Sequence, residues 1–268
     1  MEKKPQPLPT AESDTGLRLV RELARRRGVE LPPTLKSWPP WAAITLHVFI
    51  AVFYTTLWDN YLVATRVWWY DPELVTGITL GWVPIEEYTF FILQPILAGL
   101  WLLFLARRLT RPALPGDLVG WFRAAGTVLL GAIWLASAAI LITGWQPGNY
   151  LALELAWALP PIALQLAFGA DILWRYRRLV LLVIISLTLY LSATDALAIT
   201  LGTWTINPEK SLDLLIAGLL PIEEFLFFLL TTTLITFGIV LIMAQESHVR
   251  FGAIRRRLSQ ADTGTRTR

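Results

Sequence analysis

Hydrophobic residues gather in six stretches that are long enough to cross a lipid bilayer. A spanning helix needs about 20 mostly apolar residues, and each stretch approaches or exceeds that length. The stretches lack the alternation typical of a transmembrane barrel, and open strands would leave backbone groups unpaired in lipid. The pattern therefore predicts an all-α, polytopic membrane bundle of about six helices, at residues 38–58, 77–105, 124–142, 150–172, 179–202 and 214–243.

Composition agrees with a membrane protein. Of the 268 residues, 55% are hydrophobic and 16% are charged, whereas a soluble domain carries about 25% charged residues. The chain has no cysteine and only two histidines, which excludes disulfides and thiolate sites and leaves little for a histidine metal site. We therefore expect no bound metal.

The positions of the basic residues predict the orientation of the helices. All but two of the 23 Lys and Arg residues fall before the first stretch, after the last, or in the second and fourth connections. The exceptions are Arg66 and Lys210. Because positively charged loops tend to stay in the cytoplasm, both termini are expected there, in an integral membrane protein.

A set of polar and aromatic residues occurs twice, 136 or 137 positions apart. This offset spans four predicted helices, so both copies cross the membrane in the same direction, which predicts tandem parallel repeats. The first copy contains Asp59, Trp68, Pro84, Glu86, Glu87 and Phe90, and the second contains Asp195, Trp204, Pro221, Glu223, Glu224 and Phe227.

The chain ends are polar. Residues 14–27 have the spacing of an interfacial helix on anionic lipid, although a basic arm that only fixes topology is an equal alternative. The C-terminal tail ends in a polar, Arg-rich stretch that is expected to be flexible. The predicted organisation is a polar basic arm at 1–37, a first repeat at 38–142, a second repeat at 143–243 and a basic tail at 244–268.

The six duplicated acids are the strongest functional signal. An ionised side chain inside a bilayer costs about 2.5–3.5 kcal/mol, and no Lys or Arg lies within the predicted spans. Because burial disfavours the charged form of a carboxyl group, such groups are candidate proton donors. We expect the six to converge in the outer half of the membrane, although hydrogen bonding between helices is an alternative role.

Aromatic residues accompany the acids. Phe90 and Phe227 follow the first glutamate of each pair by four residues and share its helix face, where ring faces can stabilise a cation or simply pack. Trp68 and Trp204 are candidate substrate contacts, although an interfacial aromatic belt explains them better.

Other polar and helix-bending residues give weaker signals. Pro84 and Pro221 are candidate substrate contacts. They are expected to loosen the helices ahead of the acids and free backbone carbonyls, or only to kink them. Gln94 and Thr231 occupy matching positions beyond the acids, and Glu154 is expected to contact water near a helix end.

The paired Pro-Ile-Glu-Glu segments, each preceded by an aspartate and a Trp-x-x-(Asp/Asn)-Pro stretch, resemble the integral-membrane lycopene cyclase domain family, in its fused form. The resemblance covers roughly residues 40–243. One departure from repeat symmetry is that the stretch at 150–172 has no apolar counterpart before residue 38.

The resemblance implies a reaction. A proton adds to the terminal double bond of lycopene, a neighbouring double bond attacks the carbocation, and loss of a proton gives a β-ionone ring. No electrons are transferred, so no cofactor is expected. One member of the two glutamate pairs would supply the acid and another the base, with the two aspartates tuning or relaying protons. The implied partners are lycopene in the bilayer and membrane lipid, with other carotenoid enzymes as further candidates and no nucleic acid.

Three other functions fit parts of the pattern. A Glu-Glu intramembrane protease needs an arginine shortly after the pair and histidines on later spans, and a retinal-binding protein needs a lysine within a span. The predicted spans lack these features. A membrane proton or cation transporter stays open as the alternative, since intramembrane acids in repeated helices suit it.

Overall fold

The computed structural model describes residues 30–109 and 119–265, and the helix expected at 14–27 lies outside them. Six helices in this part of the chain are long and apolar enough to cross a membrane, which confirms the predicted all-α bundle. A short helix η1 (Pro33–Leu35) precedes the first of them, and η2 (Gln146–Gly148) lies between the third and the fourth. The six are α2 (Pro40–Ala64), α3 (Ile85–Arg108), α4 (Val119–Thr143), α5 (Asn149–Arg175), α6 (Arg177–Thr200) and α7 (Ile222–Met243).

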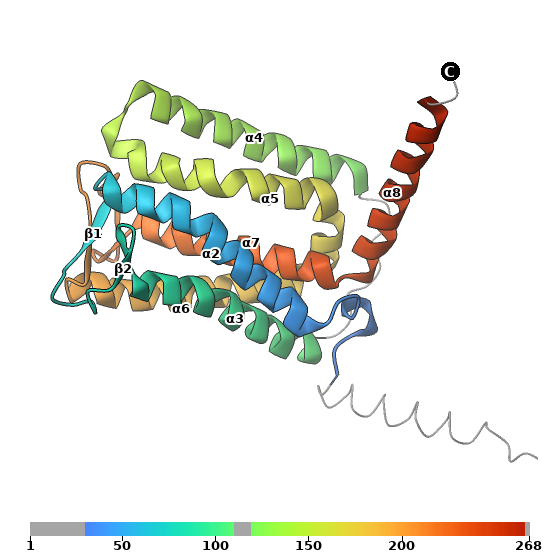
Figure 1. The fold of residues 1–268 in the computed structure, drawn as a ribbon, viewed down its shortest axis with the longest axis horizontal. Coiled ribbons are helices and arrows are strands. Elements are labelled where there is room, and N and C mark those ends of the chain that lie inside the picture. Colours follow the sequence, from blue (N-terminus) through green and yellow to red (C-terminus); the bar gives the residue numbers. More distant parts are fainter. Residues whose placement is uncertain (1–29, 110–118, 266–268) are drawn as a thin grey trace, which may run out of the picture.

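The helices run along a common direction in three layers (Figure 1). Helix α7 lies at the centre and contacts α2, α3, α5 and α6, whereas α4 packs along α5 at one side. Exposed apolar side chains such as Phe53, Leu57 and Leu129 cover the outer faces. An outer face of this kind suits lipid as the surrounding solvent.

Small residues let the helices approach closely. A side chain added at Gly99 would lie 2.4 Å from Ile44, and one added at Gly238 would lie 2.0 Å from the ring of His47. His47 is buried, and its Nδ1 lies 2.7 Å from the carbonyl oxygen of Ala43. Glycine at helix contacts is typical of membrane bundles, where close packing drives association.

Six short strands close one end of the bundle. Strands β1 (Trp68–Tyr70) and β4 (Trp204–Ile206) pair antiparallel, with Trp68 opposite Ile206 and Tyr70 opposite Trp204. Two hairpins follow them: β2 (Thr79–Leu80) with β3 (Val83–Pro84), and β5 (Leu215–Ile216) with β6 (Leu220–Pro221). Gly81 and Gly218, each with φ of 72°, take the left-handed turn positions that glycine adopts without strain.

The hairpins correct two predicted helix boundaries. The stretches expected to be helical from residues 77 and 214 begin as hairpins, and α3 and α7 start at Ile85 and Ile222. Short apolar runs do not distinguish strand from helix by periodicity alone, and here the glycines mark the turns.

The two segments α2–β1–β2–β3–α3 and α6–β4–β5–β6–α7 have the same order of elements. Helices α4 and α5 have no counterpart among the described residues. The tandem repeat of whole halves therefore stays a prediction.

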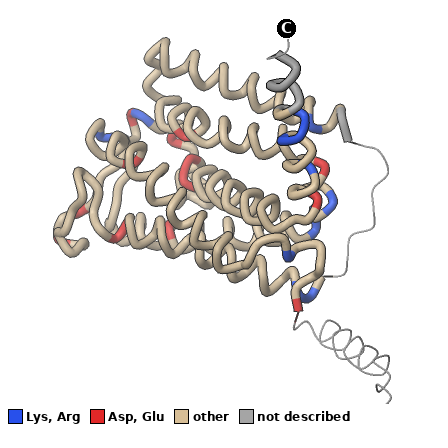
Figure 2. The backbone as a smooth tube through the Cα atoms, turned by 45° about the vertical axis from the view of Figure 1, so that its right-hand side comes forward, with Lys and Arg blue, Asp and Glu red and all other residues tan. Residues whose placement is uncertain are grey.

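Charges separate along the bundle. Lys and Arg gather at the end opposite the strands, whereas most acids lie nearer the strands (Figure 2). At the basic end, helix α8 (Gln245–Thr265) runs across the direction of the spanning helices (Figure 1). Arg250 of α8 forms an ion pair with Asp171, and Arg175 pairs with Glu246. These ion pairs dock the start of α8 on α5, whereas the flexibility expected of the Arg-rich end of the tail stays a prediction.

Candidate active site

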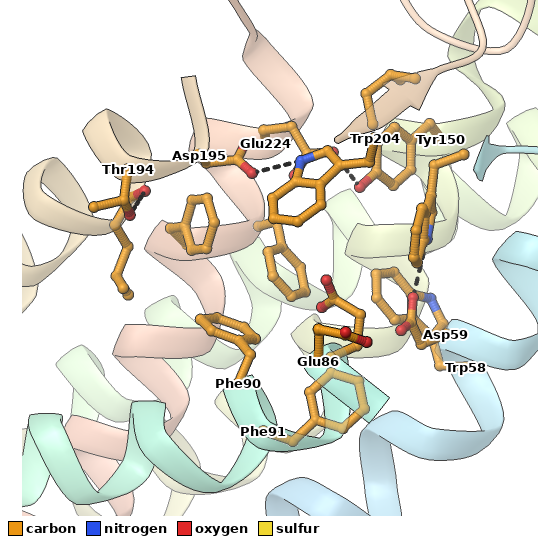
Figure 3. A pocket seen from close by; sticks show the side chains of 16 residues that line it. Trp58, Asp59, Glu86, Phe90, Phe91, Tyr150, Thr194, Asp195, Trp204 and Glu224 are labelled. Atoms are coloured by element: carbon orange, nitrogen blue, oxygen red, sulfur yellow. Dashed lines mark hydrogen bonds between the residues drawn. The ribbon is translucent and has the colours of Figure 1, made fainter. Parts of the chain in front are cut away.

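A cavity of about 230 Å³ lies beside the strands, among α2, α3, α5, α6 and α7 (Figure 3). Its lining combines carboxyl groups with aromatic rings and, among the described residues, contains no Lys or Arg. No group of three or more His, Asp or Glu residues in this part of the chain could hold a metal ion. The lining residues are Trp58, Asp59, Trp68, Glu86, Glu87, Phe90, Phe91, Tyr150, Leu191, Thr194, Asp195, Trp204, Ile206, Glu224, Phe227 and Phe228.

The two aspartates are held in the same way. The indole nitrogen of Trp68 donates a hydrogen bond to Asp59 at 3.0 Å, and that of Trp204 donates to Asp195 at 2.9 Å. Both carboxyl groups are buried, and their second oxygens have no hydrogen-bond partner. The paired strands β1 and β4 carry the two tryptophans, so the strands position both aspartates at the cavity.

The first glutamate of each pair binds the adjacent loop. Glu86 accepts a hydrogen bond from the backbone N–H of Thr76, and Glu223 accepts one from that of Leu212, each at 2.7 Å. Glu86 also lines the cavity, whereas Glu223 is fully buried and is absent from the lining. The expected convergence of the six acids therefore holds for five.

The second glutamate of each pair lies at the cavity, but the two differ in their contacts. Glu224 accepts a hydrogen bond of 2.7 Å from the hydroxyl of Tyr150 (Figure 3). No described residue donates a hydrogen bond to Glu87, which is half-buried. These glutamates and Asp195 are close enough to interact electrostatically.

Aromatic rings from four helices form a continuous wall. Phe227 stacks on Trp58 with ring centres 5.7 Å apart, and Trp58 stacks on Trp157 at 4.6 Å. Phe90 meets Phe227 at 6.4 Å. The two phenylalanines singled out in the sequence therefore come together, and both contribute to the cavity.

The two prolines have a different role from the one expected. Pro84 and Pro221 precede the first residues of α3 and α7 and act as their N-caps, so neither loosens nor kinks a helix. Proline fits at a helix start because no N–H is needed there. Neither lines the cavity, and their role as substrate contacts stays a prediction.

Sequence reasoning missed two residues of α5. Tyr150 lines the cavity with 3% of its surface exposed, and Glu154, expected in water, is fully buried with neither carboxyl oxygen hydrogen-bonded. The signal was their spacing: a tyrosine and a glutamate four residues apart lie on one helix face. Because the sequence before residue 38 contains no apolar stretch that matches this helix, a search for repeats could not find them.

This arrangement suits proton transfer to an apolar molecule. Several carboxyl groups face a space without a neutralising cation, and aromatic faces beside them can stabilise a transient positive charge. The surrounding helices keep most of these side chains away from water. Water would otherwise capture a reactive cation.

Comparisons with known proteins identify the family. A family model described as lycopene cyclase matches residues 32–105 and 149–245, leaving out α4. A lycopene beta-cyclase of Halobacterium salinarum is 39% identical over 200 residues, which cover 75% of this chain and 81% of the relative. No solved structure matches the chain.

Longer fungal proteins are also similar. A bifunctional lycopene cyclase/phytoene synthase of Aspergillus oryzae is 35% identical over 216 residues, or 78% of this chain and 36% of the relative. That of Gibberella fujikuroi is 32% identical over 197 residues, or 72% and 33%. Nothing in these comparisons supports the transporter alternative. The matched segments carry the duplicated acids, both hairpins and the cavity, and the chain belongs to the lycopene cyclase family.

Proposed function

We propose that the protein cyclises the linear ends of lycopene to β-ionone rings, as an intramolecular lyase or isomerase in carotenoid biosynthesis. The observation that carries this proposal is the cavity, where carboxyl groups without a cationic partner face a wall of aromatic rings. Proton-initiated cyclisation needs an acid, a base and a dry surface that tolerates positive charge, and this lining supplies all three.

The reaction assigns a task to each part of the site. A carboxyl group protonates the terminal double bond, and the faces of Phe90, Phe227 and Trp58 stabilise the tertiary carbocation. The neighbouring double bond closes the ring, and a second carboxyl takes up the proton that leaves. Asp59 and Asp195, held by their indole donors, tune the glutamates across the cavity.

The cavity volume supports cyclisation of one end at a time. About 230 Å³ corresponds to roughly eight groups the size of a water molecule. The six ring atoms and their methyl groups are of this size, whereas the whole linear carotenoid is several times larger. The remainder of lycopene lies along the apolar outer surface in lipid.

The charge distribution supports an orientation in the membrane. The end that carries α8 and most Arg residues faces the cytoplasm with both termini, and the strands face the other side. Helix α8 exposes Phe251 and Ile254 beside Arg255, a combination that suits the surface of an anionic bilayer.

The fungal relatives join a cyclase to a synthase in one chain, which supports other carotenoid enzymes as partners. The proposal also includes a division of the chain into two repeats, at residues 38–142 and 143–243.

Replacement of the two cavity glutamates tests the function. The double variant Glu87→Gln with Glu224→Gln, expressed in lycopene-accumulating cells, is expected to form no cyclic carotenoid, because general acid–base catalysis contributes about 100- to 10,000-fold. Glu73→Gln is the matched control, since Glu73 is exposed in the loop before β2. Cyclic product at the wild-type level from the double variant would show that these carboxyl groups do not perform the reaction.

A further inference from the structure

The two cavity glutamates are equivalent in sequence but not in structure. Glu87 and Glu224 occupy corresponding positions of the two Pro-Ile-Glu-Glu segments. The hydroxyl of Tyr150 lies 2.7 Å from Oε1 of Glu224, whereas no described residue donates a hydrogen bond to Glu87. A reaction that needs one acid and one base needs such a difference between its carboxyl groups.

Helix α5 fixes the tyrosine firmly. Tyr150 is the second residue of α5, and its backbone N–H donates to the carbonyl oxygen of Lys210 at 2.9 Å. Its ring is buried within a cluster that includes Leu62, Val67 and Phe91. The hydroxyl therefore has little freedom, and the carboxyl that it contacts is held in one place.

Glu154 lies one turn further along α5, near both glutamates of the second pair. It is fully buried, and neither of its carboxyl oxygens has a hydrogen-bond partner. An unpaired buried charge is very costly, so the position of Glu154 behind Tyr150 is unsuited to a carboxylate. Glu154 is also absent from the cavity lining.

We propose that Tyr150 makes the two halves of the site unequal, so that Glu224 is the base that removes the final proton and Glu87 is the acid that starts the reaction. This inference rests on the proposed cyclase function. A hydroxyl donor stabilises and orients a carboxylate, which is the form that a base requires. Glu87 has no such donor and faces the same cavity, so it is suited to carry the proton that is given away.

The protons balance over one ring closure. The O–H bond of Glu87 breaks, and its proton adds to the terminal double bond to give a tertiary cation. The neighbouring double bond forms the new carbon–carbon bond and moves the cation to a ring carbon. A C–H bond beside that cation breaks, its electron pair forms the ring double bond, and Glu224 takes the proton. Glu224 then releases this proton to the solvent, and Glu87 takes up a proton from the solvent, which restores the site with no net gain or loss.

The position of Glu224 then determines the ring type. Three groups beside the ring cation carry hydrogen: the carbon that bears the polyene, the ring methylene and the methyl group. Loss from the first gives a β ring, and loss from the others gives ε or γ rings. Tyr150 is thus a positioning residue, which holds Glu224 beside the first of these hydrogens.

Product analysis of single variants tests this assignment. Tyr150→Phe removes only the hydroxyl, and it is expected to lower the rate of ring formation by about three- to tenfold and to add ε or γ rings to the product. Glu224→Asp keeps a carboxyl group but withdraws it, and a similar shift in ring type is expected. Glu87→Gln is expected to form no ring of any type. Equal amounts of each variant in isolated membranes are supplied with lycopene, and the products are separated by chromatography.

Two controls separate the proposal from a structural effect. Tyr190→Phe removes a hydroxyl from an exposed tyrosine of α6. Glu154→Gln replaces a buried carboxyl outside the cavity lining by an amide of the same shape. Both variants are expected to give β rings alone.

Only β rings at the wild-type rate from Tyr150→Phe would overturn the assignment. Mixed rings from Glu87→Gln together with no ring from Glu224→Gln would show that the roles are reversed. If the wild-type protein itself forms no ring, the proposed function fails instead, so the two failures are distinguishable.

Discussion

The indole donors to the two aspartates allow a quantitative test of the site. Trp204 donates a hydrogen bond of 2.9 Å to Asp195, which is 5% exposed and whose second oxygen has no partner. Trp204→Phe keeps an aromatic ring in the cavity lining but leaves the carboxyl group of Asp195 without its donor. Trp68→Phe makes the same change at Asp59.

The structure sets the size of the expected effect. A hydrogen bond between neutral groups contributes about 0.5–1.5 kcal/mol and one to a charged group about 1.5–3 kcal/mol, and about 1.4 kcal/mol corresponds to a tenfold change. Each variant is therefore expected to cyclise lycopene about threefold to a hundredfold more slowly. A loss above tenfold indicates that the aspartate is ionised in the slow step.

The assay is the initial rate of ring formation in membranes that contain equal amounts of each variant. Trp82→Phe is the control, because this side chain is 65% exposed in the hairpin between β2 and β3. If both cavity variants match the wild-type rate within about twofold, the indole–aspartate pairs do not support the reaction and the reasoning is refuted.

Three further changes test the fold around the site. Gly238→Ala is expected to destabilise the protein by about 1–3 kcal/mol, because the new methyl group overlaps the ring of His47; an unchanged melting temperature in detergent would contradict the close contact. Gln94→Leu removes a buried hydrogen bond to Thr231 and is expected to lower the stability of the protein by about 0.6 kcal/mol, with ring formation retained. Loss of activity at normal stability would instead place Gln94 in the reaction. Arg250→Ala removes one of the two ion pairs that dock α8 and is expected to speed proteolysis of α8 while the spanning helices stay intact. Equal cleavage rates would show that this contact does not hold α8.

The sequence was sufficient to predict the six helices and the group of acids, because both signals are strong in lipid. Long apolar stretches have few alternative structures in a bilayer, and acids such as Glu87 and Glu224 stand out against them. The hairpins before α3 and α7 could not be separated from the helices, since their apolar residues continue the same pattern. Pro84 caps α3 because the helix begins directly after the hairpin, so its role could not be predicted without that helix boundary.

The missed residues depend on packing between distant segments. Nothing near Tyr150 in the sequence indicates that its hydroxyl reaches Glu224, 74 residues later. Likewise, the burial of Glu154 results from the contact of α5 with α7, which no local pattern predicts. The choice of Trp68 and Trp204 as belt residues failed to anticipate their bonds to the aspartates, because the pairing of β1 with β4 turns them inward.

The most direct test of the central claim is incubation of the purified protein, reconstituted in lipid vesicles, with lycopene in deuterated water and without any added cofactor. The account predicts cyclic product with one deuterium added per ring, because the acid that protonates the terminal double bond exchanges with the solvent and the proton lost is a different one. Recovery of unchanged lycopene, with ion flux across the vesicle membrane in its place, would contradict it.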